Sequence, residues 1–143
     1  MSALDPVRQM LADRGCPDDL IAGGLAGLAS KWESVVESVE QGYQVGLDDY
    51  LNDMDMRDLL AAALAVAPHD EADAFASQIA ALDQRLLAVT LQARCLWGED
   101  VEDDDGLDPG RDWWYYRRPV QLNQEFADEL AAWGLTDDVD GAA

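Results

Sequence analysis

Apolar residues recur at intervals of three and four along most of this chain, and that spacing is the feature that most restricts its fold. In the segment 70–97 such a stripe is formed by Phe75, Ile79, Leu82, Leu86, Val89 and Leu96. Intervals of three and four place side chains on one face of an α-helix, whereas a half-buried strand alternates every second residue. A second stripe widens the apolar arc toward the end of the segment, through Leu87, Leu91 and Cys95. The pattern predicts one long helix over 70–97, with its C-terminal half as the most buried part of the fold.

Capping residues, glycines and prolines mark the ends of the other helices. These helices are predicted from Pro6, after the N-cap Asp5, to Gly15, from Pro17 to about Ala29, from Ser30 to Gly42 and from about Asn123 to Trp133. The segment from Leu47 to Ala67 is predicted as one helix or two abutting ones, and the inner face of the last helix is expected to carry Phe126, Leu130 and Trp133. Ser30 and Glu33 form a capping box that starts the third of them. Gly23, Gly24 and Gly27 weaken the second, and we expect another backbone to approach closely there. The sequence therefore predicts an all-α protein, a single compact bundle of five to six helices over residues 1–143.

The segment 99–112 differs sharply in composition from the helices. Six of the seven residues from Glu99 to Asp105 are acidic. Like charges at that density repel one another, so we expect a solvated loop here. Asp108, Pro109 and Gly110 prolong the loop as a turn. The tail 136–143 is expected to be frayed.

An aromatic run follows this loop, and it is the strongest candidate for a contact surface. Trp113, Trp114, Tyr115 and Tyr116 precede Arg117, and these residue types are enriched at protein interfaces. We expect an extended segment, in which alternate rings face opposite ways. One pair would then pack on the helices and the other would bind a partner. The alternative is a strap that closes the core, with an arginine stacked on a ring or paired with an acid.

The formal charge of −21 restricts the possible partners. It repels nucleic acids and anionic lipids, and the arginines are too scattered to form a DNA-binding stripe, so we expect no direct contact with nucleic acid or membrane. A basic protein is the natural complement. The competing explanation is adaptation to a salt-rich host, because the chain contains a single lysine, Lys31. Under that explanation the protein would be a structural subunit.

An acidic patch surrounds Tyr50 and is a second candidate for partner binding. Asp48, Asp49 and Asp53 are its main members, and Asp49 and Asp53 lie one helical turn apart. Like charges at that spacing destabilise a helix slightly. A lysine or arginine of a partner would offset the cost, and so would exposure to solvent and counterions.

A further set of carboxylates has a catalytic interpretation. Glu37 and Glu40 share one helical face, and Asp55 and Asp58 begin a leucine-rich stretch fifteen residues later. This arrangement resembles the acidic helix pair of the all-helical nucleoside triphosphate pyrophosphatases. The resemblance implies that the four carboxylates hold magnesium against a triphosphate, as oxygen ligands do. Basic residues that would meet phosphate are scarce, however, so this enzyme is the alternative interpretation.

Other kinds of site have little support in the sequence. Cys16 and Cys95 lack a metal-type spacing, and His69 stands alone in a predicted turn. The start of the chain does not resemble a signal peptide, and no apolar run has the length of a membrane span. We therefore expect a soluble, cytoplasmic protein without a cofactor. The preferred function is non-enzymatic: a small acidic binding protein that inhibits or regulates a basic partner, of the immunity-protein, antitoxin or nucleic-acid-mimic kind.

Overall fold

The computed structural model describes residues 5–135, and within them the protein is helical except for one small sheet. The α-helices are α1 (Pro6–Asp13), α2 (Asp18–Glu40), α3 (Leu47–Val66), α4 (His69–Ala88), α5 (Glu99–Asp105) and α6 (Gln124–Ala132). The two strands are β1 (Thr90–Gln92) and β2 (Arg117–Pro119). A 3-10 helix, η1 (Trp113–Tyr116), directly precedes β2 in the sequence. The predicted all-α class is confirmed. The tail predicted to be frayed lies outside the described residues.

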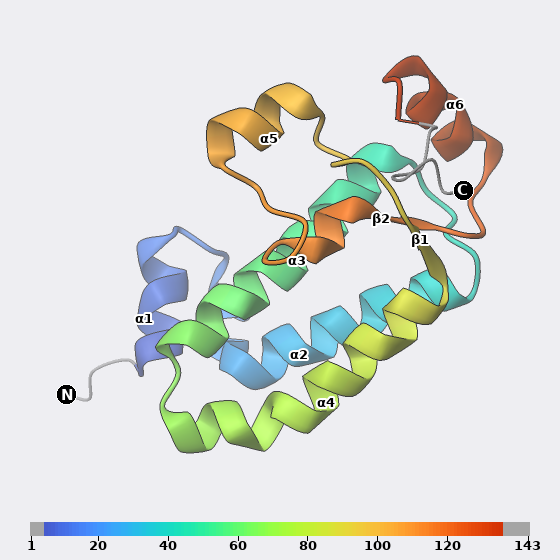
Figure 1. Cartoon of the computed structure of the whole chain (residues 1–143). Helices are drawn as coiled ribbons and strands as arrows, with labels where there is room; N and C mark the ends of the chain where they lie inside the picture. The colour runs from blue at the N-terminus through green and yellow to red at the C-terminus, as the bar shows by residue number, and fades with distance from the viewer. Residues whose placement is uncertain (1–4, 136–143) are drawn as a thin grey trace.

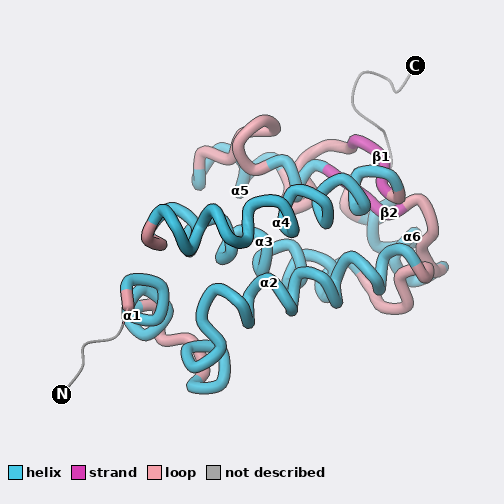
Figure 2. The backbone as a smooth tube through the Cα atoms, turned by 90° about the horizontal axis from the view of Figure 1, so that it is seen from below, coloured by secondary structure: helices cyan, strands magenta, loops and turns pink. Residues whose placement is uncertain are grey.

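The helices form a bundle built on α2, α3 and α4. α2 packs against both other helices, and α1 packs on α2 and α3. α1 lies at one end of this bundle, and α6 and the strands lie at the other (Figures 1 and 2). One cluster of buried residues runs through these elements, and its largest fully buried members are Trp32, Tyr50 and Phe126. None of the described helices combines the length and the apolar character needed to cross a membrane.

Two helix starts carry the expected caps, whereas the predicted capping box of Ser30 and Glu33 does not form because Ser30 lies inside α2. Asp5 accepts a hydrogen bond from the Arg8 backbone N–H at 2.9 Å, and Asn123 accepts one from the Phe126 N–H at 2.8 Å. Both satisfy N–H groups that a helix start leaves without a partner. α3 is capped from a distance, since a carboxylate oxygen of Glu129 in α6 accepts from the Leu47 N–H at 3.0 Å. α6 buries Phe126 as predicted, but Trp133, expected on its inner face, is the C-cap of the helix and is 59% exposed.

α2 breaks at Gly24, where φ is +58° and ψ is −151°. Only glycine adopts such values readily, because a Cβ would collide with the backbone. The Arg8 guanidinium lies against the break and donates hydrogen bonds to the Ala22 carbonyl oxygen at 3.3 and 3.0 Å. Two predictions are therefore corrected. The helix boundary lies at Gly24 rather than at Ser30, and the close neighbour is an arginine side chain rather than a backbone.

α4 is shorter than predicted, because it ends at Ala88 and the chain continues into β1. The Thr90 hydroxyl donates to the Leu86 carbonyl oxygen at 2.8 Å, which closes the last turn. β1 then pairs antiparallel with β2, with Thr90 opposite Pro119 and Leu91 opposite Arg118. The partner strand is far away in the sequence, so local periodicity did not reveal this pairing.

The most buried helices are α2 and α3 rather than α4. The buried residues of α4 are Ile79, Leu82 and Leu86, whereas those of α2 form a longer series from Leu20 to Val39. The helix α2 is covered on several sides by α1, α3 and α4, whereas α4 contacts chiefly α2 and leaves its outer face to solvent. An apolar stripe on one helix therefore did not identify the centre of the bundle.

Candidate functional site

The aromatic run coils into the 3-10 helix η1 instead of extending, which overturns the predicted alternation of rings. Three residues per turn distribute the rings around the helix axis. Trp114, Tyr115 and Tyr116 are each 3–4% exposed, and Trp113 is half-buried. No outward-facing pair of rings exists in this run. The alternative interpretation, a segment that closes the core, describes its position better.

The buried tyrosines of η1 place their hydroxyl groups against surface carboxylates. Tyr115 donates to Asp55 of α3, and Tyr116 donates to Glu102 of α5. Burial and these carboxylates raise the pKa of both phenols, so both remain donors. A buried aromatic ring with a satisfied polar end anchors well. The segment η1 thereby ties α5 to the bundle.

Arg57 of α3 lies beneath η1 and is 8% exposed. Its Nε and Nη2 donate to the two carboxylate oxygens of Asp83 at 2.9 and 2.8 Å, and the Trp32 indole N–H donates to Asp83 at 3.0 Å. The guanidinium also lies 4.7 Å from the centre of the Trp114 ring. Its Nη1 has no acceptor among the described residues, and the cation–π contact compensates part of that loss. We name this group, Arg57, Asp83, Trp32 and Trp114, the arginine–tryptophan cluster.

Arg117, predicted to bind a partner, uses its guanidinium inside the protein. It donates to the Thr90 hydroxyl at 3.0 Å and to the carbonyl oxygens of Leu87 and Thr90 at 3.1 and 2.7 Å. Carbonyl groups at the end of a helix lack intrahelical partners. Arg117 therefore satisfies the C-terminal end of α4 and fixes the turn into β1. Burial lowers the pKa of this guanidinium.

The acidic patch lies on the first turns of α3. Asp48 and Asp49 are exposed, and Asp53 is half-buried and accepts a hydrogen bond from the Tyr43 hydroxyl. Burial raises the pKa of Asp53, and the charge of Asp49 raises it further. Burial also raises the pKa values of Asp55 and Asp58. We refer to Asp53, Asp55 and Asp58 as the α3 aspartates.

The carboxylates of the pyrophosphatase interpretation do not converge on one site. Glu40 of α2 pairs with Arg85 of α4, and Asp55 of α3 accepts from Tyr115 on η1. Glu37 is exposed, and Asp58 has Asp55 as a charged neighbour but also Asp112, Arg14 and Arg111, which are not part of the set. Within residues 5–135, no group of three or more histidine, cysteine or acidic side chains is arranged to hold a metal ion. The geometry therefore lacks the shared ligand set that this enzyme needs.

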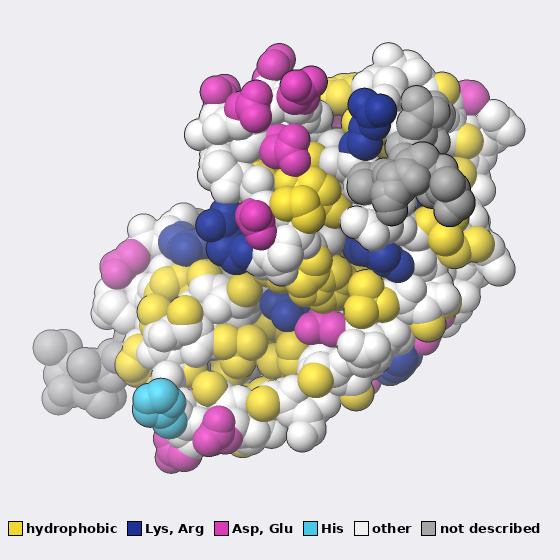
Figure 3. Space-filling view, viewed as in Figure 1, with side chains coloured by type: hydrophobic (Ala, Val, Ile, Leu, Met, Phe, Trp, Pro, Cys, Tyr) yellow, Lys and Arg dark blue, Asp and Glu magenta, His cyan; other side chains and the backbone are white. Residues whose placement is uncertain are grey.

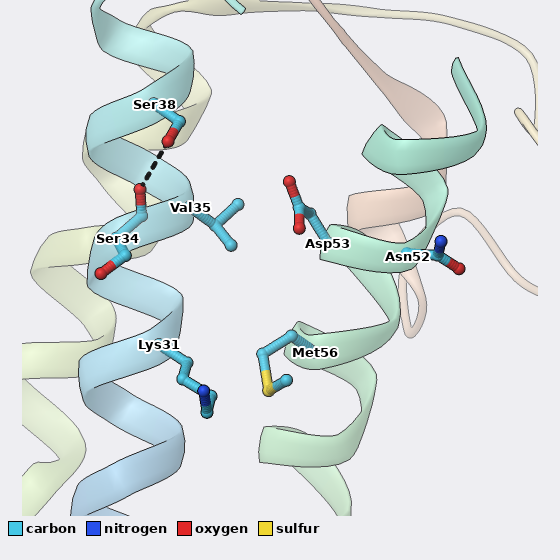
Figure 4. A pocket seen from close by; sticks show the side chains of 7 residues that line it. All are labelled: Lys31, Ser34, Val35, Ser38, Asn52, Asp53 and Met56. Atoms are coloured by element: carbon cyan, nitrogen blue, oxygen red, sulfur yellow. Dashed lines mark hydrogen bonds between the residues drawn. The ribbon is translucent and has the colours of Figure 1, made fainter. Parts of the chain in front are cut away.

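A groove of about 340 Å³ lies between α2 and α3 (Figure 4). Its lining residues are Lys31, Ser34, Val35, Ser38, Asn52, Asp53 and Met56. In Figure 4 the Asp53 side chain points toward α2, whereas Asn52 points away, and Val35 and Met56 lie between the two helices. The sequence singled out Asp53 alone from this set. Serines repeated every fourth residue on α2, at 30, 34 and 38, were the available signal for a polar groove.

The acidic segment is a short helix, α5, rather than the predicted loop. Gly98 precedes it with φ +95°, and Gly106 ends it in the left-handed conformation with φ +66°. Acids in its first turn are favoured by the helix dipole. α5 has no buried residue, and its acidic side chains gather at the top of the face in Figure 3. The prediction that this segment is solvated agrees with that exposure.

No protein-family model matches the chain, and neither the curated proteins nor the solved structures gave a significant match.

Proposed function

We propose that this protein is a small, non-enzymatic acidic binding protein that inhibits or regulates a basic protein partner. The observation that supports it best is α5, a helix of seven residues that exposes five acidic side chains and is tied to the bundle through Glu102. Gly98 precedes the helix and Gly106 follows it, and the Tyr116 hydroxyl donates a hydrogen bond to Glu102. Carboxylates that a helix already holds in place lose less conformational entropy on binding a basic segment than the carboxylates of a flexible acidic tail would.

The distribution of the basic residues favours the same function. The side chains of Arg8, Arg57, Arg85 and Arg111 form ion pairs with carboxylates of the same chain. Each pair is neutral, so the excess of negative charge stays with the remaining acids. Long-range attraction would then speed the encounter with a basic partner, and close contacts would set its lifetime.

The two cysteines agree with a cytoplasmic site of action. Cys16 and Cys95 are both unpaired, and Cys95 is buried. Reduced thiols are the usual state in the cytoplasm, where disulfides rarely persist. The partner that we propose is therefore a basic cytoplasmic protein, such as a toxin or a nucleic-acid-binding protein.

The test compares two variants that each remove five negative charges. The α5-neutral variant changes the exposed acids of α5 to amides, at Glu99, Asp100, Asp103, Asp104 and Asp105. The matched control changes exposed acids elsewhere to asparagine, at Asp13, Asp18, Asp19, Asp70 and Asp73. Glu102 stays in both, because it accepts from Tyr116. Partners are recovered from the native host at low ionic strength, and their binding kinetics are then measured with purified proteins.

We expect one basic partner that binds the wild type and the control but binds the α5-neutral variant at least tenfold more weakly. Its association rate should fall as salt is added, because charges are screened over about 8 Å at physiological ionic strength. Wild-type binding by both variants would exclude α5 as the docking surface. Equal weakening of binding in both variants would mean that affinity depends on net charge alone, which would favour a structural subunit of a salt-adapted host.

A further inference from the structure

The polar groups of the α2–α3 groove offer mainly acceptors at one end. The hydroxyls of Ser34 and Ser38 donate to the carbonyl oxygens of Ser30 and Ser34 at 3.3 and 3.0 Å. With its proton used in this way, the Ser38 hydroxyl oxygen keeps its lone pairs for a donor in the groove, whereas the Ser34 hydroxyl lies on the side of α2 turned away from Asp53 (Figure 4). Asp53 uses Oδ2 to accept from Tyr43, which leaves Oδ1 for another donor. A ligand at this end must therefore supply several hydrogen-bond donors.

The middle and the opposite end of the groove differ in chemistry. Val35 and Met56 form an apolar stretch beside the acceptors, and Lys31 lies level with Met56 (Figure 4). The chain has no other lysine. From Lys31 to Ser38 the helix rises about 10 Å, so acceptors, apolar surface and one cation follow one another within the length of a single long residue.

The geometry points to this groove as the binding site for an arginine residue of the basic partner. The guanidinium binds Asp53 and the Ser38 hydroxyl, its methylene stem packs on Val35 and Met56, and its main-chain carbonyl accepts from Lys31. Arginine fits better than lysine, because its planar fork carries five donors that can reach separate acceptors. Long basic side chains also pack their stems on apolar surface. The identity of the partner rests on the proposed function, whereas recognition of arginine by the groove does not.

The test uses a defined probe, Nα-acetyl-arginine N-methylamide, and follows the methyl groups of Val35 and Met56 by NMR. The citrulline analogue is the matched probe, since it keeps the length and removes the charge. We expect saturable shifts at both methyl groups with the arginine probe and none with the citrulline analogue. Asp53→Asn should weaken binding about tenfold, the effect of losing one charge-assisted hydrogen bond.

Two further variants separate a site from diffuse attraction. Asp48→Asn removes the same charge from an exposed position of α3 that does not line the groove, and it should bind the probe as the wild type does. Ser38→Leu fills the groove from the exposed side of α2 without changing charge, and it should abolish the shifts. Wild-type binding by Ser38→Leu, or equal loss in Asp48→Asn and Asp53→Asn, would overturn the inference.

The outcomes for the groove and for α5 are independent. A probe that fails to bind, with partner binding still lost in the α5-neutral variant, removes the groove and leaves the proposed function. A probe that binds, with partner binding unchanged in the α5-neutral variant, leaves the groove and removes α5 as the docking surface.

Discussion

Two arginine–carboxylate pairs in this protein have the same bonding pattern and differ in burial, which allows a sharp prediction. Arg57 binds both oxygens of Asp83 at 2.9 and 2.8 Å, and Arg85 binds both oxygens of Glu40 at 3.0 and 2.6 Å. The side chains of the first pair are 9% and 16% exposed, and those of the second are 42% and 32% exposed. A stability difference between the two pairs therefore reports mainly on burial.

Asp83→Ala leaves the buried Arg57 guanidinium without a counter-charge and the Trp32 N–H without its acceptor. Removing one partner of a buried pair costs about 3–5 kcal/mol. Glu40→Ala releases an arginine that water solvates freely, and we expect its stability to match that of the wild type. Guanidinium chloride denaturation followed by far-UV circular dichroism measures both variants.

A double variant tests the cause. Arg57→Met combined with Asp83→Leu removes both charges and keeps apolar volume, so it should recover a large share of the loss. If Asp83→Ala and Glu40→Ala cost the same, or if the double variant is the least stable, then burial does not govern these pairs and the reasoning is wrong.

Three further predictions concern stability and its dependence on pH. Gly24→Ala should lower the free energy of unfolding by about 1–3 kcal/mol, because Gly24 has a positive φ. Gly23→Ala should raise it by up to about 1 kcal/mol, because Gly23 is helical and has open space around it. Equal effects of the two substitutions in thermal melts would contradict backbone strain at Gly24. Trp114→Ala should cost about 3–5 kcal/mol and the exposed Trp133→Ala less than about 0.5 kcal/mol, as measured by urea denaturation. The α3 aspartates have raised pKa values, so each binds its proton more tightly in the folded chain and the free energy of unfolding falls as pH rises from the ordinary to the raised pKa. The melting temperature, measured at high salt, should therefore increase as the pH is lowered from the raised pKa to the ordinary pKa of aspartate. A constant or decreasing melting temperature over that range would refute the prediction.

Helix starts were the part of the fold that the sequence predicted best. Asp5 and Asn123 act on N–H groups within three residues, so their effect is local and visible in the sequence. Local periodicity also gave the bounds of α3, although the sequence left open whether it was one helix or two abutting ones. In contrast, the end of α4 depends on pairing of β1 with β2, residues that are far apart in the chain. Leu91, Cys95 and Leu96 follow a helical spacing in the sequence, yet all three lie beyond the end of α4, and Leu91 is 41% exposed.

The candidate sites show the same division between local and distant causes. Exposure of α5 follows from its composition, although its helical form depends on the glycines at its ends. The η1 tyrosines are typical interface residues, yet hydrogen bonds to Asp55 and Glu102 place them in the core. The groove requires α2 and α3 to pack side by side, and only Asp53 of its lining was identified as a candidate from the sequence.

The long span of the η1 contacts has a consequence for the order of folding. Tyr50 donates at 2.7 Å across 67 positions to the carbonyl oxygen of Arg117, which directly follows η1, and Trp114 of η1 lies 4.7 Å from the Arg57 guanidinium. Helix pairing within residues 6–88 needs only nearer contacts and should form first, since contacts between distant residues carry a larger entropic cost. During synthesis, a nascent chain that stops before η1 therefore exposes an uncovered arginine and indole surface. That intermediate is the species most exposed to aggregation or to capture by a chaperone.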